Sequence, residues 1–304
     1  MEQVTAQLLA DGVKSFADSF HGLLSNIDRK AADLRSEQMK VTVSGLGKHL
    51  ATLKGAVSGL ASADLVGRIW ERDHTVWADD PTEIEDRLGW LDVAEAMKGW
   101  LPDLASFADE VKAEGFQKVV LLGMGGSSLG PEVLRRTFGS ADGYPELAVL
   151  DSTLPETVSG AGAGGLDRTL FVVSSKSGTT TEPLTMYRHF RGLVDSLVGN
   201  NAAGRSFVCV TDPGTPLAAL AERDGFRRTF EATHDLGGRY SVLSHFGLVP
   251  TALVGIDVGT LLDRAIGMRW RCAASVSPDQ NPGAWLGAAM AAMANIGRDK
   301  LTLV

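Results

Sequence analysis

Residues 119–131 have the sequence VVLLGMGGSSLGP, in which a short apolar run leads directly into glycines and serines. An uninterrupted apolar run of this length is typical of a parallel strand that is covered on both faces. A helical pattern follows from Leu129 to Phe138. The glycines therefore lie where a strand ends and a helix begins, and there backbone N–H groups and the helix dipole favour an anion. We predict an anion-binding loop.

The same order of strand, loop and helix recurs further along the chain. Short apolar runs alternate with helical patterns, which predicts a doubly wound α/β fold with a mainly parallel sheet between helices, an αβα sandwich. Ligands of such sheets bind at the carboxyl ends of the strands. We expect strands over 118–124, 147–151, 169–174, 206–211 and 228–232, and crossover helices over 129–138, 182–197 and 216–224.

A second polar loop follows the strand expected at 169–174. Its sequence concentrates hydroxyl groups and one cation around Gly178, in Ser175, Lys176, Ser177, Thr179 and Thr180. Hydroxyl groups donate hydrogen bonds to phosphate oxygens without adding charge, and Lys176 is either a nearby cation or the partner in a structural ion pair. The alternative is a serine and threonine turn that only caps the following helix.

A third segment, GGRYS at residues 237–241, places two glycines before one arginine. Gly237 and Gly238 allow a close approach of the backbone to a ligand, and the guanidinium of Arg239 suits charge that develops on a sugar oxygen. The alternative for Arg239 is a surface salt bridge. We assign no role to the flanking His234 and His245, and we expect the run from Val242 to Leu248 to be helical.

Composition narrows the classes of partner. The chain of 304 residues has 29 basic and 37 acidic residues and a formal charge of −8, so we expect no binding to nucleic acid or to anionic membranes. Two cysteines, Cys209 and Cys272, predict reduced thiols and a cytoplasmic protein. Charged residues interrupt the first thirty positions, which excludes a signal peptide or membrane span there.

Helices are expected ahead of the α/β region. Apolar residues spaced three and four apart predict an amphipathic helix from Val4 to Ile27. Pro81 predicts the start of another, whose buried face would comprise Leu88, Trp90, Leu91 and Val93. We divide the chain into an N-terminal helical segment, 1–40, and an α/β domain, 41–304.

The three polar segments, in this order, resemble the glucose-6-phosphate isomerase family and its sugar isomerase (SIS) domain. DPTEI at 80–84 and RLGWL at 87–91 extend the resemblance, which runs from about residue 45 to the end. It implies isomerisation of glucose 6-phosphate and fructose 6-phosphate without metal or organic cofactor, by a homodimer. By position, Gly126 and Ser127 would contact the sugar, and Arg239 would stabilise an enediolate. The phosphate would be held by Ser175, Lys176, Ser177, Thr179 and Thr180.

The resemblance also concerns the two ends of the chain. It places the glutamate base, the ring-opening histidine and a late lysine beyond Val304, and KLTLV at 300–304 predicts the beginning of a strand. We therefore expect a C-terminally truncated chain that binds phosphosugar better than it turns it over. LADGV at 9–13 resembles the last helix of transaldolase, which precedes such isomerases in some fused bacterial proteins; an ordinary helix is the alternative.

Two other functions stay open at this point. One is a module that senses a sugar phosphate without chemistry. The other is a dinucleotide or nucleotide-sugar enzyme, against which the glycine spacing argues, because Ser128 stands where the dinucleotide fingerprint needs its third glycine. No glycine-lysine pair followed by serine or threonine closes this loop, so a Walker A site is excluded.

Overall fold

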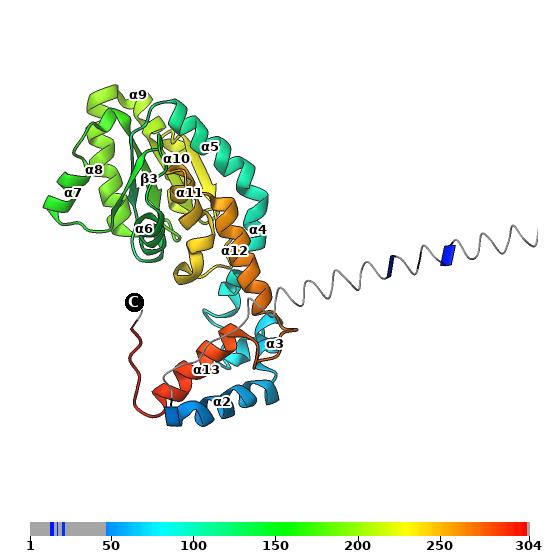
Figure 1. Cartoon of the computed structure of the whole chain (residues 1–304). Helices are drawn as coiled ribbons and strands as arrows, with labels where there is room; N and C mark the ends of the chain where they lie inside the picture. Colours follow the sequence, from blue (N-terminus) through cyan, green and yellow to red (C-terminus); the bar gives the residue numbers. More distant parts are fainter. Residues whose placement is uncertain (1–12, 15–16, 18–19, 22–46, 303–304) are drawn as a thin grey trace, which may run out of the picture. The chain divides into compact units, whose positions relative to one another are not determined.

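A computed structural model describes residues 47–302 and, before them, Val13, Lys14, Ala17, Phe20 and His21 (Figure 1). Its contacts divide the chain at Trp70 and Trp270. Glu71–Arg269 form one compact unit, and the described residues on either side of that stretch form the other. Most of the helix expected over 4–27, its resemblance to transaldolase and the boundary expected at residue 40 lie outside the described residues and stay predictions.

The larger unit is built on a parallel sheet. The described residues contain a five-stranded sheet in the order β2-β1-β3-β4-β5, in which every neighbouring pair is parallel. The expected strands are all present, which confirms the predicted α/β class. They are β1 (Lys118–Leu122), β2 (Glu146–Leu150), β3 (Thr169–Ser174), β4 (Phe207–Thr211) and β5 (Arg228–Glu231).

Helices cover both faces of this sheet, because successive strand side chains point to opposite sides. Val119 and Leu121 of β1 belong to one core, and Val120 and Leu122 belong to another. The first core contains residues of α5 (Leu101–Ala113), α11 (His245–Leu253) and α12 (Val258–Arg271); the second contains residues of α8 (Thr181–Val198) and α10 (Pro216–Arg223). Figure 1 shows α8 and α5 on opposite sides of β3.

Shorter elements complete the described residues. The smaller unit has its own apolar contact, in which Leu53 and Val57 pack with Ala288. No helix among the described residues has the length and apolar character that crossing a bilayer requires. The remaining helices are α2 (Leu50–Ser62), α3 (Leu65–Trp70), α4 (Val93–Ala96), α6 (Gly126–Phe138), α7 (Pro155–Ala161), α9 (Asn200–Ala203) and α13 (Pro282–Ala294), and the 3-10 turns are η1 (Gly47–His49), η2 (His74–Val76), η3 (Glu85–Arg87), η4 (Gly89–Leu91), η5 (Met97–Trp100), η6 (Leu166–Arg168), η7 (Gly204–Ser206) and η8 (Gly238–Leu243).

The helix expected to start at Pro81 is wrong. The Asp80 side chain accepts a hydrogen bond from the Thr82 N–H at 2.9 Å, which closes a turn, and Glu83 has a φ of 62°, which no helical residue adopts. Trp90, expected on a buried face, is 36% exposed.

Three further expectations near loops and ends are also wrong. The run from Val242 to Leu248 is not one helix, because η8 ends at Leu243 and Ser244, in extended conformation, caps α11 through its hydroxyl. Helix α6 begins at Gly126 rather than at Leu129, so part of the glycine loop forms its first turn. Residues 300–302, the described part of the last expected strand, are not in a strand.

Strand order decides where a ligand binds. The chain leaves β1 through α6 toward β2 and leaves β3 through α8 toward β4, so these two crossovers lead to opposite sides of the sheet. Loops diverge at such a point and leave a crevice at the carboxyl ends of the strands. The glycine loop after β1 and the serine and threonine loop after β3 both lie there.

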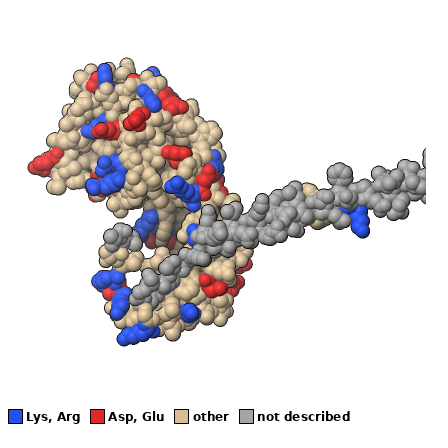
Figure 2. All heavy atoms as spheres, viewed as in Figure 1, with Lys and Arg blue, Asp and Glu red and all other residues tan. Residues whose placement is uncertain are grey.

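Charge on the larger unit is mixed. On the face that Figure 2 shows, lysines and arginines lie among acidic side chains and form no broad basic surface. An anion that binds to the larger unit therefore needs hydrogen-bond donors in the binding site itself.

The aromatic cluster behind β3 provides a test of the core. Phe171 is fully buried. The centroid of its ring lies 4.7 Å from that of Phe190 and 5.2 Å from that of Phe207. We expect Phe171→Ala to lower the free energy of unfolding by about 3–5 kcal/mol, measured by urea denaturation. The control Phe138→Ala, at a half-exposed position, should change it by no more than about 0.5 kcal/mol. Equal losses in both variants would contradict this packing.

Candidate functional site

One cavity of about 370 Å³ brings the three polar segments of the sequence together. It lies where the loops after β1 and β3 diverge, and the loop before η8 closes another side. Its lining residues are Asp86, Arg87, Met124, Gly126, Ser127, Lys176, Ser177, Thr180, Asp212, His234, Gly237 and Gly238.

A contact between two glycines fixes the first and third segments against each other. A Cβ atom on Gly126 would lie 2.0 Å from the carbonyl oxygen of Gly238, closer than any side chain allows. The Ser241 hydroxyl donates to that same carbonyl at 2.7 Å. Further along α6, a Cβ on Gly130 would lie 2.7 Å from Val242 Cγ2. The Gly-Gly-Arg loop therefore packs directly on the first turns of α6 because glycines stand there.

Hydrogen bonds within the second segment hold its hydroxyl groups. Ser175, which is buried, lies with its Oγ 3.0 Å from Thr180 Oγ1, and Ser177 Oγ lies 2.9 Å from Thr179 Oγ1. The turn passes through Gly178, whose φ of 66° favours glycine. Among the described residues no side chain caps the first turn of α8. Its positive end therefore stays open to an anion.

Lys176 forms an ion pair, the structural alternative that the sequence left open. Its ammonium group donates to Asp212 Oδ2 and, at 3.4 Å, to the carbonyl oxygen of His234. Burial raises the pKa of Asp212, and the hydrogen bond from Lys176 opposes that rise. The second carboxylate oxygen, Oδ1, is buried without a hydrogen-bond partner among the described residues. One N–H of Lys176 is left for a ligand, while Asp212 offsets much of its charge.

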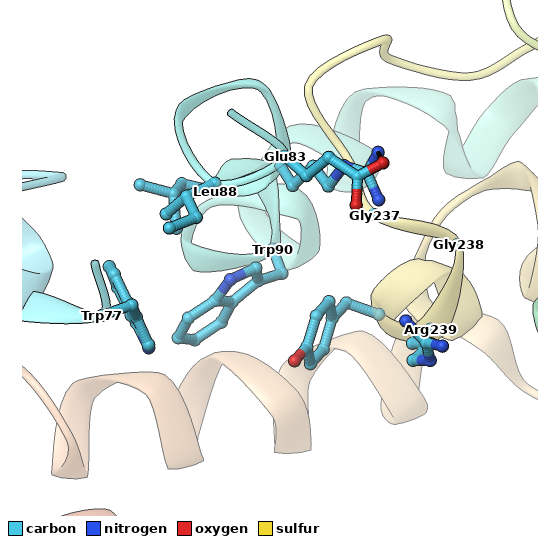
Figure 3. Close-up of a pocket in the computed structure, with 10 residues that line it drawn as sticks. Trp77, Glu83, Leu88, Trp90, Gly237, Gly238 and Arg239 are labelled. Carbon is cyan, nitrogen blue, oxygen red and sulfur yellow. Dashed lines mark ion pairs between the residues drawn. The ribbon is translucent and has the colours of Figure 1, made fainter. Parts of the chain in front are cut away.

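Arg239 lies in a neighbouring pocket of about 270 Å³, which shares Arg87, Gly237 and Gly238 with the cavity (Figure 3). Aromatic rings make up much of its wall. The rings of Trp90 and Tyr240 have centroids 5.9 Å apart. Figure 3 shows Trp90 between Trp77 on one side and Arg239 on the other.

The predicted residues thus fall into three groups. Gly126, Ser127, Lys176, Ser177 and Thr180 line the cavity. Ser175 lies beneath it, bonded to Thr180, whereas Thr179 and Arg239 are exposed and do not line it.

Several lining residues were not predicted from the sequence, among them Asp212 and Arg87. Asp212 directly follows β4, beside β3, and the rule that ligands bind at strand carboxyl ends could have found it. No local pattern marks Arg87. It reaches the cavity because Leu88 forms a bridge with Leu236 and the Gly89 N–H donates to the Asp235 carbonyl at 2.8 Å.

His245, to which the sequence assigned no role, is a buried core residue. Its Nδ1 lies 2.8 Å from the carbonyl oxygen of Glu231, and its ring packs against Trp100 at a centroid distance of 4.7 Å. Burial lowers the pKa of His245, which favours the neutral ring. His234 lines the cavity and is exposed.

Fold and cavity together define a doubly wound α/β protein with a ligand cavity at the point where its crossovers diverge. The family model for phosphoglucose isomerase matches residues 91–290. The chain belongs to the phosphoglucose isomerase family.

Similar proteins agree with this assignment. The chain is 35% identical over 188 residues to a glucose-6-phosphate isomerase of Staphylococcus saprophyticus, a match of 59% of this chain and 42% of that protein. It is 34% identical over 185 residues to the enzyme of Staphylococcus haemolyticus, covering 58% and 41%. The matched region therefore spans less than half the length of these relatives.

Solved structures share the fold. A hypothetical protein from Thermus thermophilus superimposes with a TM-score of 0.68 at 26% identity, covering 80% of this chain and 56% of that one. A glucose-6-phosphate isomerase from Chlamydia trachomatis gives a TM-score of 0.57 at 24% identity, covering 77% and 42%. At 24% identity, the similarity to the Chlamydia trachomatis structure shows a shared fold and nothing more.

The glycine contact can be tested by adding one methyl group. We expect Gly126→Ala to lower the free energy of unfolding by about 1–3 kcal/mol, because the methyl group overlaps the Gly238 carbonyl. Gly192→Ala is the control: the exposed Gly192 has open space around it within α8, so this variant should gain up to about 1 kcal/mol. Urea denaturation measures both. Stabilisation of the Gly126→Ala variant would show that the loop packs elsewhere.

The buried Asp212 in its ion pair with Lys176 predicts that the free energy of unfolding depends on pH. Because the pKa of Asp212 is raised on folding, the folded protein takes up a proton before the unfolded chain does as the pH falls toward 3.8. The parent protein should therefore gain stability relative to Asp212→Asn over this acid range. Urea denaturation of both proteins at several pH values below neutrality measures the difference. A relative loss by the parent protein would mean that the ion pair, rather than burial, dominates.

Proposed function

We propose that this chain carries the phosphosugar-binding part of an isomerase that interconverts glucose 6-phosphate and fructose 6-phosphate. The observation that carries the proposal is that residues from all three polar segments meet at one cavity at the carboxyl edge of β1 and β3: Gly126, Ser127, Lys176, Ser177, Thr180, Gly237 and Gly238. Membership of the phosphoglucose isomerase family supports the same substrates.

In this proposal the serine and threonine loop binds the phosphate. Ser177 and Thr180 line the cavity and donate to phosphate oxygens, while Ser175 and Thr179 orient them through the hydroxyl contacts of 3.0 and 2.9 Å. The uncapped N-terminus of α8 adds a favourable dipole, and Lys176 adds one N–H. Gly126 and Ser127 contact the sugar from the opposite side of the cavity.

Arg239 acts at the reacting end of the sugar. Isomerisation moves a proton between C2 and C1 through a cis-enediolate, so negative charge grows on an oxygen during the reaction. A guanidinium donates to that oxygen and lowers the barrier only when the charge has formed. The proton transfer also needs a general base, to which no residue of this chain is assigned. The reaction requires neither a metal nor an organic cofactor.

Location and assembly extend the proposal. We propose a cytoplasmic homodimer; both cysteines, Cys209 and Cys272, are free thiols, which fits a reducing compartment. Light scattering of the purified protein measures the assembly.

A coupled assay and a binding measurement together test the activity. The assay follows formation of glucose 6-phosphate from fructose 6-phosphate by the whole gene product, and calorimetry measures fructose 6-phosphate binding to residues 1–304. Turnover and binding support the proposal. Binding without turnover by the whole gene product would indicate a sensor, and absence of both would refute a phosphosugar site.

Arg239→Ala separates chemistry from binding. We expect it to lower kcat in the whole gene product by roughly 10²–10³-fold and to affect fructose 6-phosphate binding much less, because the charge that Arg239 meets exists only during reaction. The control Arg136→Ala, on the exposed side of α6, should leave both unchanged. Equal losses of kcat and binding in the Arg239→Ala variant would count against this role.

A further inference from the structure

We propose that Arg87 is a substrate-positioning residue that sets the affinity for a dianionic phosphosugar by exchanging its ion pairs for the phosphate. This inference rests on the proposed function and adds a residue to the same site. The observation behind it is that Arg87 lines both the cavity and the neighbouring pocket of Arg239.

Backbone contacts hold Arg87 in place at the junction of these two spaces. Leu88 bridges to Leu236, and the Gly89 N–H bonds the Asp235 carbonyl at 2.8 Å. A Cβ on Gly89 would lie 2.9 Å from the backbone carbonyl oxygen of Asp235, so glycine at this position favours the close approach. The stem of Arg87 lies along Gly237, with its Cβ and Cδ at 3.6 and 3.7 Å from the position of a Cβ there.

Charge around the cavity favours Arg87 as the cation for a ligand. Asp212 offsets the ammonium charge of Lys176 and is itself only 14% exposed, so that pair is poorly solvated. Arg87 instead pairs with Glu83 at 3.0 Å and Asp86 at 3.6 Å, whose side chains are 71% and 67% exposed.

Solvent screens exposed ion pairs of this kind, and they contribute little to stability. A guanidinium binds phosphate through charge-assisted and often bidentate hydrogen bonds, which are stronger. A phosphate that enters the cavity therefore competes well for Arg87. The carboxylate of Glu83 lines the pocket of Arg239 but not the cavity, so it acts on the ligand through Arg87.

Five proteins test this exchange, each as the whole gene product: the parent protein, the variants Arg87→Gln, Arg87→Lys and Glu83→Gln, and the double variant of Glu83→Gln with Arg87→Gln. We expect Arg87→Gln to raise the KM for fructose 6-phosphate roughly tenfold with kcat within about twofold, a loss typical of one hydrogen bond to a charged group. Arg87→Lys should restore most of the affinity, and inorganic phosphate as a competitor should weaken in parallel in the Arg87→Gln variant.

The variant Glu83→Gln should change the affinity for fructose 6-phosphate in the opposite direction. Removing this competing carboxylate should tighten fructose 6-phosphate binding about two- to threefold, since an exposed ion pair is weak. The gain should vanish in the double variant with Arg87→Gln, because the effect passes through the guanidinium. If Arg87 is merely structural, Glu83→Gln should have the same effect on binding with and without Arg87→Gln.

Failure of this inference and failure of the proposed function are distinguishable. If the parent protein binds fructose 6-phosphate and the Arg87→Gln variant binds it equally well, Arg87 has no such role and the proposed function stands. If the parent protein binds neither fructose 6-phosphate nor inorganic phosphate, the proposed function itself fails. Should Arg87→Gln not fold, Glu83→Gln still decides, and unchanged or weaker binding by that variant overturns the proposal.

Discussion

The close approach of Gly126 to Gly238 is the constraint on which the candidate site depends. A Cβ atom on residue 126 would lie only 2.0 Å from the Gly238 carbonyl oxygen. Two backbone segments that are far apart in sequence therefore touch without side chains between them. This contact brings the loop after β1 to the loop before η8. The serine and threonine loop after β3 joins them because β1 and β3 are neighbours in the sheet. A single cavity results because Gly126 leaves room for the Gly238 carbonyl and because β1 and β3 are adjacent in the sheet.

Electrostatics at this cavity are local and nearly balanced. The chain as a whole carries a formal charge of −8, and Lys176 is paired with Asp212. In the proposed function, recognition of the phosphate therefore falls to hydroxyl groups, to the open N-terminus of α8 and to the guanidinium of Arg87, whose ion-pair partners are exposed. In the same proposal, such a site would hold the phosphate through oriented neutral donors and leave charge available for the step in which a sugar oxygen becomes negative.

The segments that were wrongly predicted share a cause. Near Pro81 the composition favours a helix start, but the Asp80 carboxylate captures the Thr82 N–H and Glu83 takes a positive φ, so a turn forms instead. Between Val242 and Leu248 the apolar pattern favours a helix, yet a Cβ on Gly247 would lie 1.9 Å from the Val242 carbonyl. That contact requires the chain to bend at Ser244. Local hydrogen bonds and close approaches override composition where the backbone turns.

The sequence by itself determined the five strands, the α/β class and the polar loops after β1 and β3, because continuous apolar runs and glycine or hydroxyl clusters depend on short stretches of chain. Only the tertiary structure decided that Asp212 forms an ion pair with Lys176 and that Arg239 lines a second pocket beside the cavity. It also decided that Arg87 lines both the cavity and that pocket. Each of these outcomes joins residues from different strands or turns. Such pairings follow from strand order and from the steric room at Gly126 and Gly89, which no local pattern encodes.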